Sequence, residues 1–292
     1  MRIAFIGFGE AAGAIVAGWG PREDLRGYDI KTAAAEIRTA MLARYEALGV
    51  EGGGTIAEAL RNAEAVFSTV TADQAVAAAE AAAPHLPKGA FWFDCNSCAP
   101  SSKRRAAEII ETTGGRYVDV AVMAPVYPKR NMVPLLIAGP HVAEAAPFLK
   151  ALPMAPTVVD GPVGAASSIK MIRSVFVKGL EALTAECALA AVAAGVEDAV
   201  LPSLKVSHPG LDWERQVAYN FERVMVHGLR RAAEMEEVAK TLSDLGLPSL
   251  MTRSTVEWQR RIALAGVKPP TDPIAEGYRP MAEALLPAMR KG

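Results

Sequence analysis

The sequence is poor in the residues that usually mark metal, redox and nucleic-acid-binding proteins. It contains only three cysteines, and its four histidines are scattered without the spacing of metal ligands. The formal net charge is -1, so electrostatics favour neither nucleic acid nor an acidic membrane as a partner. We therefore expect a protein with no metal site and no nucleic-acid partner.

Long hydrophobic runs are also missing. The longest, Cys187–Val196, is too short to span a bilayer. A strand-like segment, Ile3–Ile6, follows the first residues directly and leaves no room for a cleavable leader. These features predict a soluble, cytoplasmic protein without a membrane partner.

Two of the three cysteines form a CxxC pair, Cys95 and Cys98, directly after the apolar run Ala90–Phe93. Such a pair can be a thiol–disulfide centre or half of a zinc site. A structural zinc site needs four ligands, and no second pair exists. A dithiol centre stays open on these residues alone.

Short apolar segments alternate with alanine-rich helical segments in the first half of the chain. This alternation predicts an α/β Rossmann-type domain with a mostly parallel sheet. From Gly164 onward strand patterns end, and stretches rich in Ala, Leu, Glu, Arg and Met predict an all-α C-terminal domain. Gly/Pro punctuation at 160–164 divides the chain into 1–163 and 164–292. The predicted strands are Arg2–Gly7, Gly27–Asp29, Ala65–Val70, Ala90–Asp94, Tyr117–Val120 and Pro134–Ala138.

A glycine motif follows the first predicted strand. Ile3–Gly13 reads IAFIGFGEAAG, in which Gly7, Gly9 and Ala12 fit G-x-G-x-x-G/A. Small residues there permit a tight turn, close approach of a pyrophosphate, and close helix–strand packing, while the helix N-terminus faces the anion. The position between a strand and an apolar helix predicts dinucleotide binding. The cofactor residues predicted in this motif are Gly7, Phe8, Gly9, Glu10, Ala11 and Ala12.

The choice of nicotinamide cofactor depends on the end of the second strand. Asp29 is expected to accept hydrogen bonds from ribose hydroxyls, which slightly favours NAD over NADP. Lys31 and Thr32 could hold a 2'-phosphate if Asp29 turns away, so NADP stays open. Ligands of open α/β sheets bind at the carboxyl ends of strands. The cofactor residues predicted after later strands are Thr69, Val70, Thr71 and Asn96.

The segment that opens the helical half carries a polar stripe. Gly161–Gly179 reads GPVGAASSIKMIRSVFVKG, and Lys170, Ser174 and Lys178 share one helix face at i, i+4 and i+8. The rest of the helix is apolar enough to favour a cleft over a solvated face. Partial desolvation of a lysine in such a cleft suits general acid–base use.

Together these motifs resemble the β-hydroxyacid dehydrogenase superfamily, which includes 3-hydroxyisobutyrate and 6-phosphogluconate dehydrogenases. Four segments match in order over roughly the first 200 residues. They are GFGEAA, the loop Asp94–Ser97 with Pro100, the segment Asp119–Val122, and Gly164 to Lys170. The C-terminal part resembles a domain of uncharacterised bacterial phosphogluconate dehydrogenase-like oxidoreductases.

The resemblance implies an NAD(P)-dependent dehydrogenase or reductase acting on the CH–OH group of a small, carboxylate-bearing hydroxy acid. It implies that Lys170 is the acid/base, that Ser97 and residues 119–125 line the substrate pocket, and that the protein is a homodimer. On the C-terminal helix that contains HGLRR, His227 and Arg231 form either a substrate-binding wall or a solvated face. The predicted substrate residues are Ser97, Val122, Met123, Ala124, Ser174, Lys178, His227 and Arg231.

The chain departs from the family at two positions near the substrate. Met123-Ala124-Pro125 stands where the family has Ser-Gly-Gly, and Ser174 replaces an asparagine. Two alternatives stay open: an imine reductase of the same fold, against which the retained Lys170 argues, and a non-catalytic nucleotide-binding protein. The resemblance also assigns the CxxC pair to the family's loop, which argues against a redox role.

Overall fold

The structure is a computed structural model that describes residues 1–290. Lys291 and Gly292, the last residues of the predicted second domain, lie outside this description. The chain divides into two compact units, Met1–Met171 and a second that begins at Ile172. The division falls within one long helix, α7 (Ala165–Ala194).

The first unit contains an eight-stranded sheet with the order β3-β2-β1-β4-β5-β6-β7-β8. β6 and β7 pair antiparallel, whereas the other neighbouring strands pair in parallel. The predicted Rossmann-type fold is confirmed, and all six predicted strands are present. The strands are β1 (Ile3–Ile6), β2 (Leu25–Tyr28), β3 (Glu51–Gly52), β4 (Ala65–Ser68), β5 (Phe91–Asp94), β6 (Arg116–Val122), β7 (Pro134–Ala138) and β8 (Ala155–Val158).

The two strands missing from the prediction are the edge strands β3 and β8. β3 consists of two exposed residues, and β8 contains a proline and is exposed at its last two residues. Neither has the apolar run or alternation by which a strand is predicted from sequence. The other six strands are long enough or apolar enough to show that pattern.

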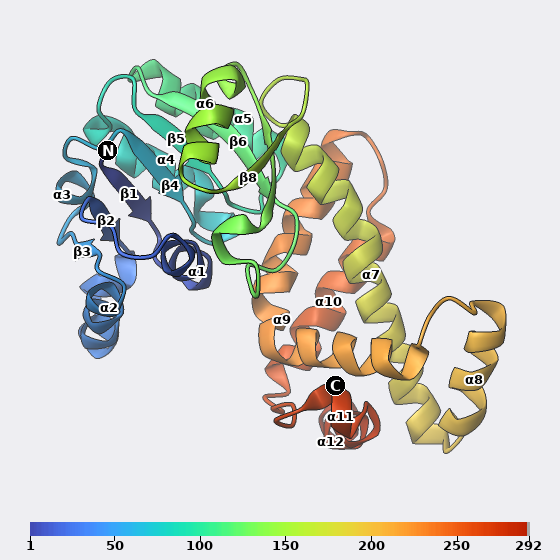
Figure 1. Ribbon diagram of the computed structural model, residues 1–292. Helices are drawn as coiled ribbons and strands as arrows, with labels where there is room; N and C mark the ends of the chain where they lie inside the picture. The colour runs from blue at the N-terminus through green and yellow to red at the C-terminus, as the bar shows by residue number, and fades with distance from the viewer. Residues whose placement is uncertain (291–292) are drawn as a thin grey trace. The chain divides into compact units, whose positions relative to one another are not determined.

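Helices cover both faces of the sheet (Figure 1). Alternate strand residues enter two separate cores, because successive side chains point to opposite faces. Phe5, Phe67 and Phe93 pack with α1, α2 and α6, while Val66 and Trp92 pack with α3, α4 and α5. Burial of both faces explains why the central strands are almost wholly apolar. These helices are α1 (Glu10–Trp19), α2 (Ala35–Ala47), α3 (Ile56–Leu60), α4 (Ala75–Ala82), α5 (Pro100–Thr112) and α6 (Val142–Ala151).

The strand order reverses next to β1, which pairs with β2 on one side and β4 on the other. In such sheets the crevice at the carboxyl ends of these strands is the ligand site. The carboxyl ends of β1, β4 and β5 lead into the glycine loop, Thr69 and the segment Asp94–Ser97, respectively. Topology therefore brings three of the predicted cofactor segments to one edge of the sheet.

The described part of the second unit is helical, as predicted. Its core joins α7, α8, α9, α10 and α12 around Trp213, Phe221 and Leu285, and α9 and α10 lie side by side (Figure 1). The homodimer stays a prediction; α7 leaves Ile172 and Phe176 exposed. No helix of residues 1–290 is long and apolar enough to cross a membrane. The remaining helices are α8 (Glu197–Ser207), α9 (Trp213–Asp244), α10 (Leu250–Leu264), α11 (Pro273–Glu276) and α12 (Arg279–Met289).

Candidate functional site

The glycine loop between β1 and α1 is shaped by backbone constraints at Gly7. This residue has φ +82°, and a Cβ there would lie 2.8 Å from the carbonyl oxygen of Thr69. The Thr69 hydroxyl donates a 2.6 Å hydrogen bond to the Gly7 carbonyl. The turn therefore requires glycine, and Thr69, predicted at the cofactor, fixes it from β4.

Gly9 differs from Gly7 because no described atom explains why it is a glycine. A Cβ at Gly9 would meet nothing within 4 Å. Gly9 is also the N-cap of α1, and as a glycine it has no side chain with which to cap that helix. A helix N-terminus with open space beside its N-cap glycine fits a pyrophosphate. The loop thus fits a dinucleotide on its own geometry.

Asp29 connects the end of β2 to the glycine loop. Its Oδ2 accepts a 2.8 Å hydrogen bond from the Phe8 amide, and its Oδ1 accepts one of 2.9 Å from the Lys31 amide. Each oxygen keeps a lone pair that can accept from a ribose hydroxyl. The Thr32 hydroxyl donates inward to the Asp29 carbonyl at 2.6 Å, so of these two residues Lys31 is the exposed one. Exposed Arg38 lies at the same turn, where its Nε donates to the Thr32 carbonyl at 2.8 Å.

The other predicted cofactor residues differ in how much of their side chains is exposed to a ligand. The Phe8 ring is fully buried against Phe5 and Tyr45, so any role at the cofactor falls to its backbone. Ala12 is buried in the same core, as its packing role predicts. The residues with exposed or half-buried surface are Glu10, Ala11, Val70 and Thr71.

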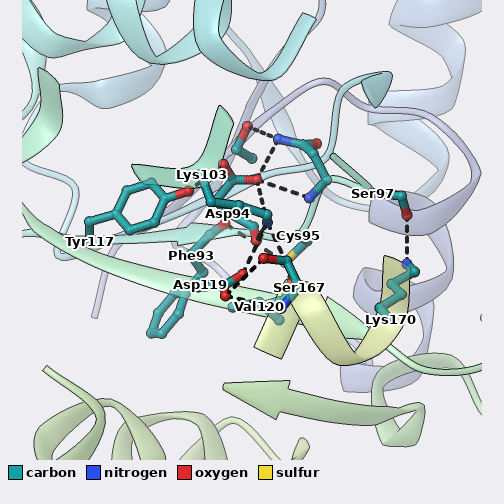
Figure 2. Close-up of polar contacts among 12 residues, drawn as sticks. Phe93, Asp94, Cys95, Ser97, Lys103, Tyr117, Asp119, Val120, Ser167 and Lys170 are labelled. Atoms are coloured by element: carbon teal, nitrogen blue, oxygen red, sulfur yellow. Dashed lines mark hydrogen bonds and ion pairs between the residues drawn. The ribbon is translucent and has the colours of Figure 1, made fainter. Parts of the chain in front are cut away.

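The structure brings together two predicted site residues that are 73 positions apart in sequence. Lys170, near the start of α7, donates from Nζ to Ser97 Oγ at 2.5 Å (Figure 2). Both side chains are half-buried. A lysine amine bonded to a hydroxyl at the carboxyl edge of a dinucleotide-binding sheet can exchange a proton with a substrate oxygen.

A second lysine of the first unit, which sequence reasoning missed, is buried in the core. Lys103 of α5 is fully buried, and Nζ donates to the Asp94 carbonyl at 2.5 Å, to Asp94 Oδ1 at 3.0 Å and to the Val120 carbonyl at 3.3 Å. Asp119 Oδ1 lies 3.6 Å away. Burial alone would lower the pKa of Lys103, but the adjacent carboxylates, Asp94 first, raise it above its ordinary value. Lys103 is therefore a buried cation.

Two sequence features mark this cluster in retrospect. Asp94 and Asp119 are directly paired across β5 and β6, at the carboxyl end of β5 and in the middle of β6. Lys103 shares the buried face of α5 with Ala106 and Ile110 at i+3 and i+7. A charged residue in an apolar stripe, facing two acidic strand positions, indicates a buried ion pair.

Asn96 has its donors engaged within the protein. Its backbone amide donates to Asp94 Oδ1 at 3.0 Å, and Nδ2 donates to Asp94 Oδ1 at 2.7 Å and to Ser68 Oγ at 2.9 Å. Asn96 Oδ1 is buried without a partner among residues 1–290. The donors of Asn96 are thus engaged within the protein, and the place of Asn96 at the cofactor stays a prediction.

The CxxC cysteines are buried and do not form a disulfide with each other. Burial raises the pKa of Cys95 to about 12, and Cys98 packs against Ala72 and Ala75. Redox and metal chemistry both require the thiolate, which burial disfavours at Cys95. Within residues 1–290 no group of three or more His, Cys, Asp or Glu could hold a metal ion.

Replacing both cysteines should therefore leave function intact. We expect a Cys95→Ala, Cys98→Ala variant to keep wild-type cofactor affinity and most of its turnover, because both thiols are buried. Alanine avoids burying an unpaired hydroxyl. Fluorescence titration with NADH and steady-state kinetics check this, and activity that depends on a reductant in the wild type alone would contradict it.

The predicted substrate loop lies at the end of β6. Val122 and Ala124 pack at the margin of the first core, and Met123 packs beside Ala121 and Ala138. The loop thus presents apolar side chains, and part of its backbone is engaged, because the Met123 amide donates to the Pro134 carbonyl at 2.9 Å. This differs from the small, polar Ser-Gly-Gly of the family.

Two predicted substrate residues of α7, Ser174 and Lys178, are both buried. Lys178 Nζ lies 2.8 Å from Glu234 Oε2 and donates to Ser174 Oγ at 3.4 Å. The charge of Lys178 is therefore paired with a carboxylate inside the second unit. A substrate role for these two residues stays a prediction.

The predicted residues of α9 have similar surroundings. Arg231 forms a two-pronged ion pair with buried Glu181, with Nε donating to Oε2 at 3.0 Å, and Gln259 donates to the same oxygen at 3.1 Å. Arg231 is therefore not a solvated residue but part of a buried charge pair. His227 is half-buried on the same helix. Neither is shown to bind substrate.

The strand order and the glycine loop at the start of α1 are those of a dinucleotide-binding protein. The family model described as the NAD binding domain of 6-phosphogluconate dehydrogenase matches residues 2–153, and Domain of unknown function (DUF1932) matches residues 191–262. The chain belongs to the family of the first model, within the β-hydroxyacid dehydrogenase superfamily that its motifs resemble.

Solved structures extend the comparison. A conserved hypothetical protein from Sinorhizobium meliloti is 39% identical, with a TM-score of 0.74 and coverage of 99% of this chain and 96% of that one. The 3-hydroxyisobutyrate dehydrogenase of Mycobacterium tuberculosis is 15% identical, with a TM-score of 0.70 and coverages of 90% and 94%. An imine reductase from Myxococcus stipitatus in complex with NADP+ is 16% identical, with a TM-score of 0.54 and coverages of 91% and 95%. The last two show a shared fold.

Proposed function

We propose that the protein is an NAD(P)-dependent oxidoreductase that acts on a small hydroxy acid or on its aldehyde or keto form. Hydride would pass between the nicotinamide and the carbinol or carbonyl carbon. The observation that carries this proposal is the 2.5 Å hydrogen bond from Lys170 Nζ to Ser97 Oγ. It supplies a proton-transfer group in the unit that also holds the glycine loop.

The bound nicotinamide would supply the hydride chemistry. The residues of the chain would exchange the proton, orient the substrate and hold the cofactor. In oxidation, Lys170 in its neutral form takes the hydroxyl proton as hydride leaves the same carbon, and in reduction it returns that proton. Ser97 accepts from Lys170 and keeps its own hydroxyl proton for a substrate oxygen. The backbone of 122–124 orients the carboxylate. Gly9 and the first turn of α1 hold the pyrophosphate.

A substrate panel tests the proposal. Hydroxy acids with NAD+ or NADP+, and aldehydes, keto acids and cyclic imines with the reduced cofactors, are followed by the absorbance of the reduced nicotinamide. Turnover of an alcohol–carbonyl pair supports the proposal. Amine products would instead identify an imine reductase, the alternative whose fold this chain shares. Cofactor binding with no turnover on any pair would identify a nucleotide-binding protein.

Cofactor choice gives a separate prediction. NADH should bind more tightly than NADPH, because the Asp29 carboxylate, held by the Phe8 and Lys31 amides, would repel a 2'-phosphate. Isothermal titration with both cofactors measures this. A Lys31→Met control should leave NADH affinity unchanged. NADPH binding more than about tenfold tighter, a difference of about 1.4 kcal/mol, would show that Lys31 outweighs Asp29.

A further inference from the structure

Two segments must be placed correctly for Lys170 to meet Ser97. One is the turn after β5, which carries Ser97, and the other is the start of α7, which carries Lys170. They are 73 residues apart in sequence, yet both connect to one buried group. That group is the Lys103 ammonium (Figure 2).

The first connection runs through Asp94. Asp94 Oδ1 accepts from Lys103 Nζ at 3.0 Å and also from the amide and Nδ2 of Asn96, the residue before Ser97. Asp94 Oδ2 accepts from the Tyr117 hydroxyl at 2.6 Å. Burial, and then the charge of Asp94, raises the pKa of Tyr117 well above its ordinary value, so this hydroxyl stays a donor. The carboxylate thereby fixes the turn that presents Ser97.

The second connection runs through Asp119, whose Oδ1 lies 3.6 Å from Lys103 Nζ. Its Oδ2 accepts from the Gly164 amide at 3.0 Å, the Ser167 amide at 3.1 Å and the Ser167 hydroxyl at 3.2 Å. A carboxylate on these amides caps the N-terminus of α7. Lys170 follows Ser167 by three residues, so the cap fixes the turn of helix from which Lys170 extends.

We propose that Lys103 is a positioning residue for the reaction: through Asp94 and Asp119 it sets the distance between Ser97 and Lys170. This inference rests on the proposed function and adds to it a residue that touches neither substrate nor cofactor. Carbonyl oxygens of Asp94 and Val120 complete the contacts of the ammonium group. Lys103 therefore holds the end of β5 and the central part of β6, as well as both carboxylates, in one arrangement.

A hydrophobic side chain would fill the same space with less desolvation. Replacing a buried ion pair by apolar residues is often neutral or stabilising, so stability alone is weak grounds for retaining one. What an apolar side chain does not supply is directional bonding to two carboxylates whose other oxygens hold the two site segments. Positional control of the Ser97–Lys170 pair is the property that Lys103 adds.

The main test is Lys103→Met, which keeps the length of the side chain and removes its charge. We expect kcat to fall by about 10- to 100-fold, because displacement of a reacting group by about 1 Å can cost 10²-fold. The dissociation constant for NADH should stay within about twofold, since the glycine loop does not depend on this cluster. Kinetics are measured well below the melting temperature of each variant, so that global unfolding does not contribute.

A second readout reports on Lys170 without turnover. The rate at which trinitrobenzenesulfonate modifies Lys170 is measured by peptide mass spectrometry and divided by the rate for exposed Lys88. Loosening of either segment should free the amine from Ser97 and raise this ratio several-fold. If the wild type turns over no substrate yet the ratio rises, the positioning role holds and the proposed function fails.

Milder variants test each connection if Lys103→Met does not fold. Tyr117→Phe removes one bond to Asp94, and Ser167→Ala removes one to Asp119. Each should lower kcat several-fold and raise the labelling ratio. Ser168→Ala, the same change one residue further along α7, is the matched control and should change neither.

The opposite pattern overturns the inference. Folded variants of Lys103, Tyr117 and Ser167 that melt at lower temperature but keep wild-type kcat and the wild-type labelling ratio would show that the cluster only stabilises the fold. If the wild type turns over a hydroxy acid in the same experiments, the proposed function stands while the positioning role fails.

Discussion

A Lys170→Met variant should lose turnover by about 10²–10⁴-fold, the usual contribution of a positioned acid–base group. Methionine keeps the apolar stem and approximate length of lysine but cannot exchange a proton. The Ser97 hydroxyl would lose its 2.5 Å partner and become the only polar group of the pair. Affinity for NADH should change little, because the pyrophosphate site at Gly7–Ala12 is made by a different segment.

The control for this experiment is Lys88→Met, which makes the same change at an exposed position of the first unit. It should leave kcat and the dissociation constant for NADH unchanged. Near-normal turnover of Lys170→Met would contradict the proposed mechanism and direct attention to Lys178 or His227. Loss of cofactor binding along with activity would mean that Lys170 is structural. Steady-state kinetics and fluorescence titration together separate these results.

The features that could be predicted from sequence are those determined by neighbouring residues in the chain. Gly7 is required by its own backbone angle, and the central strands are apolar because both faces are covered. The order of the four motifs led to Lys170 and Ser97, and the structure places these two within hydrogen-bonding distance. β3 and β8, by contrast, exist because a neighbouring strand pairs with them, and their own residues carry no strand pattern.

The features that escaped prediction depend on contacts between distant segments. Lysine ordinarily lies on a solvated helix face, so the sequence gives no reason to expect Lys103 in the core. The pairing of β5 with β6 places two carboxylates opposite its ammonium group. In the same way, sequence does not show that the Thr32 hydroxyl turns toward the Asp29 carbonyl. Strand register and hydroxyl direction are set by tertiary structure, so a single sequence carries no pattern for them.

The glycine loop allows cofactor binding to be separated from folding with a pair of similar substitutions. Gly9→Ala should leave the melting temperature unchanged, since a Cβ there meets nothing within 4 Å. The same methyl group would lie where the pyrophosphate approaches the first turn of α1. We expect NADH affinity to fall at least about tenfold, or about 1.4 kcal/mol, measured by isothermal titration.

Gly7→Ala, in contrast to Gly9→Ala, should lower the stability of the folded protein. Its φ of +82° costs a non-glycine residue about 1–2 kcal/mol, and the added Cβ would lie 2.8 Å from the Thr69 carbonyl oxygen. We expect a lower melting temperature by calorimetry even without cofactor. Gly210→Ala, where a Cβ also meets nothing within 4 Å, controls for the change in chain entropy: it should not lower the melting temperature and should leave NADH affinity unchanged. Wild-type NADH affinity in a stable Gly9→Ala variant would show that the pyrophosphate does not lie over Gly9, and the assignment of the cofactor site to this loop would then be wrong.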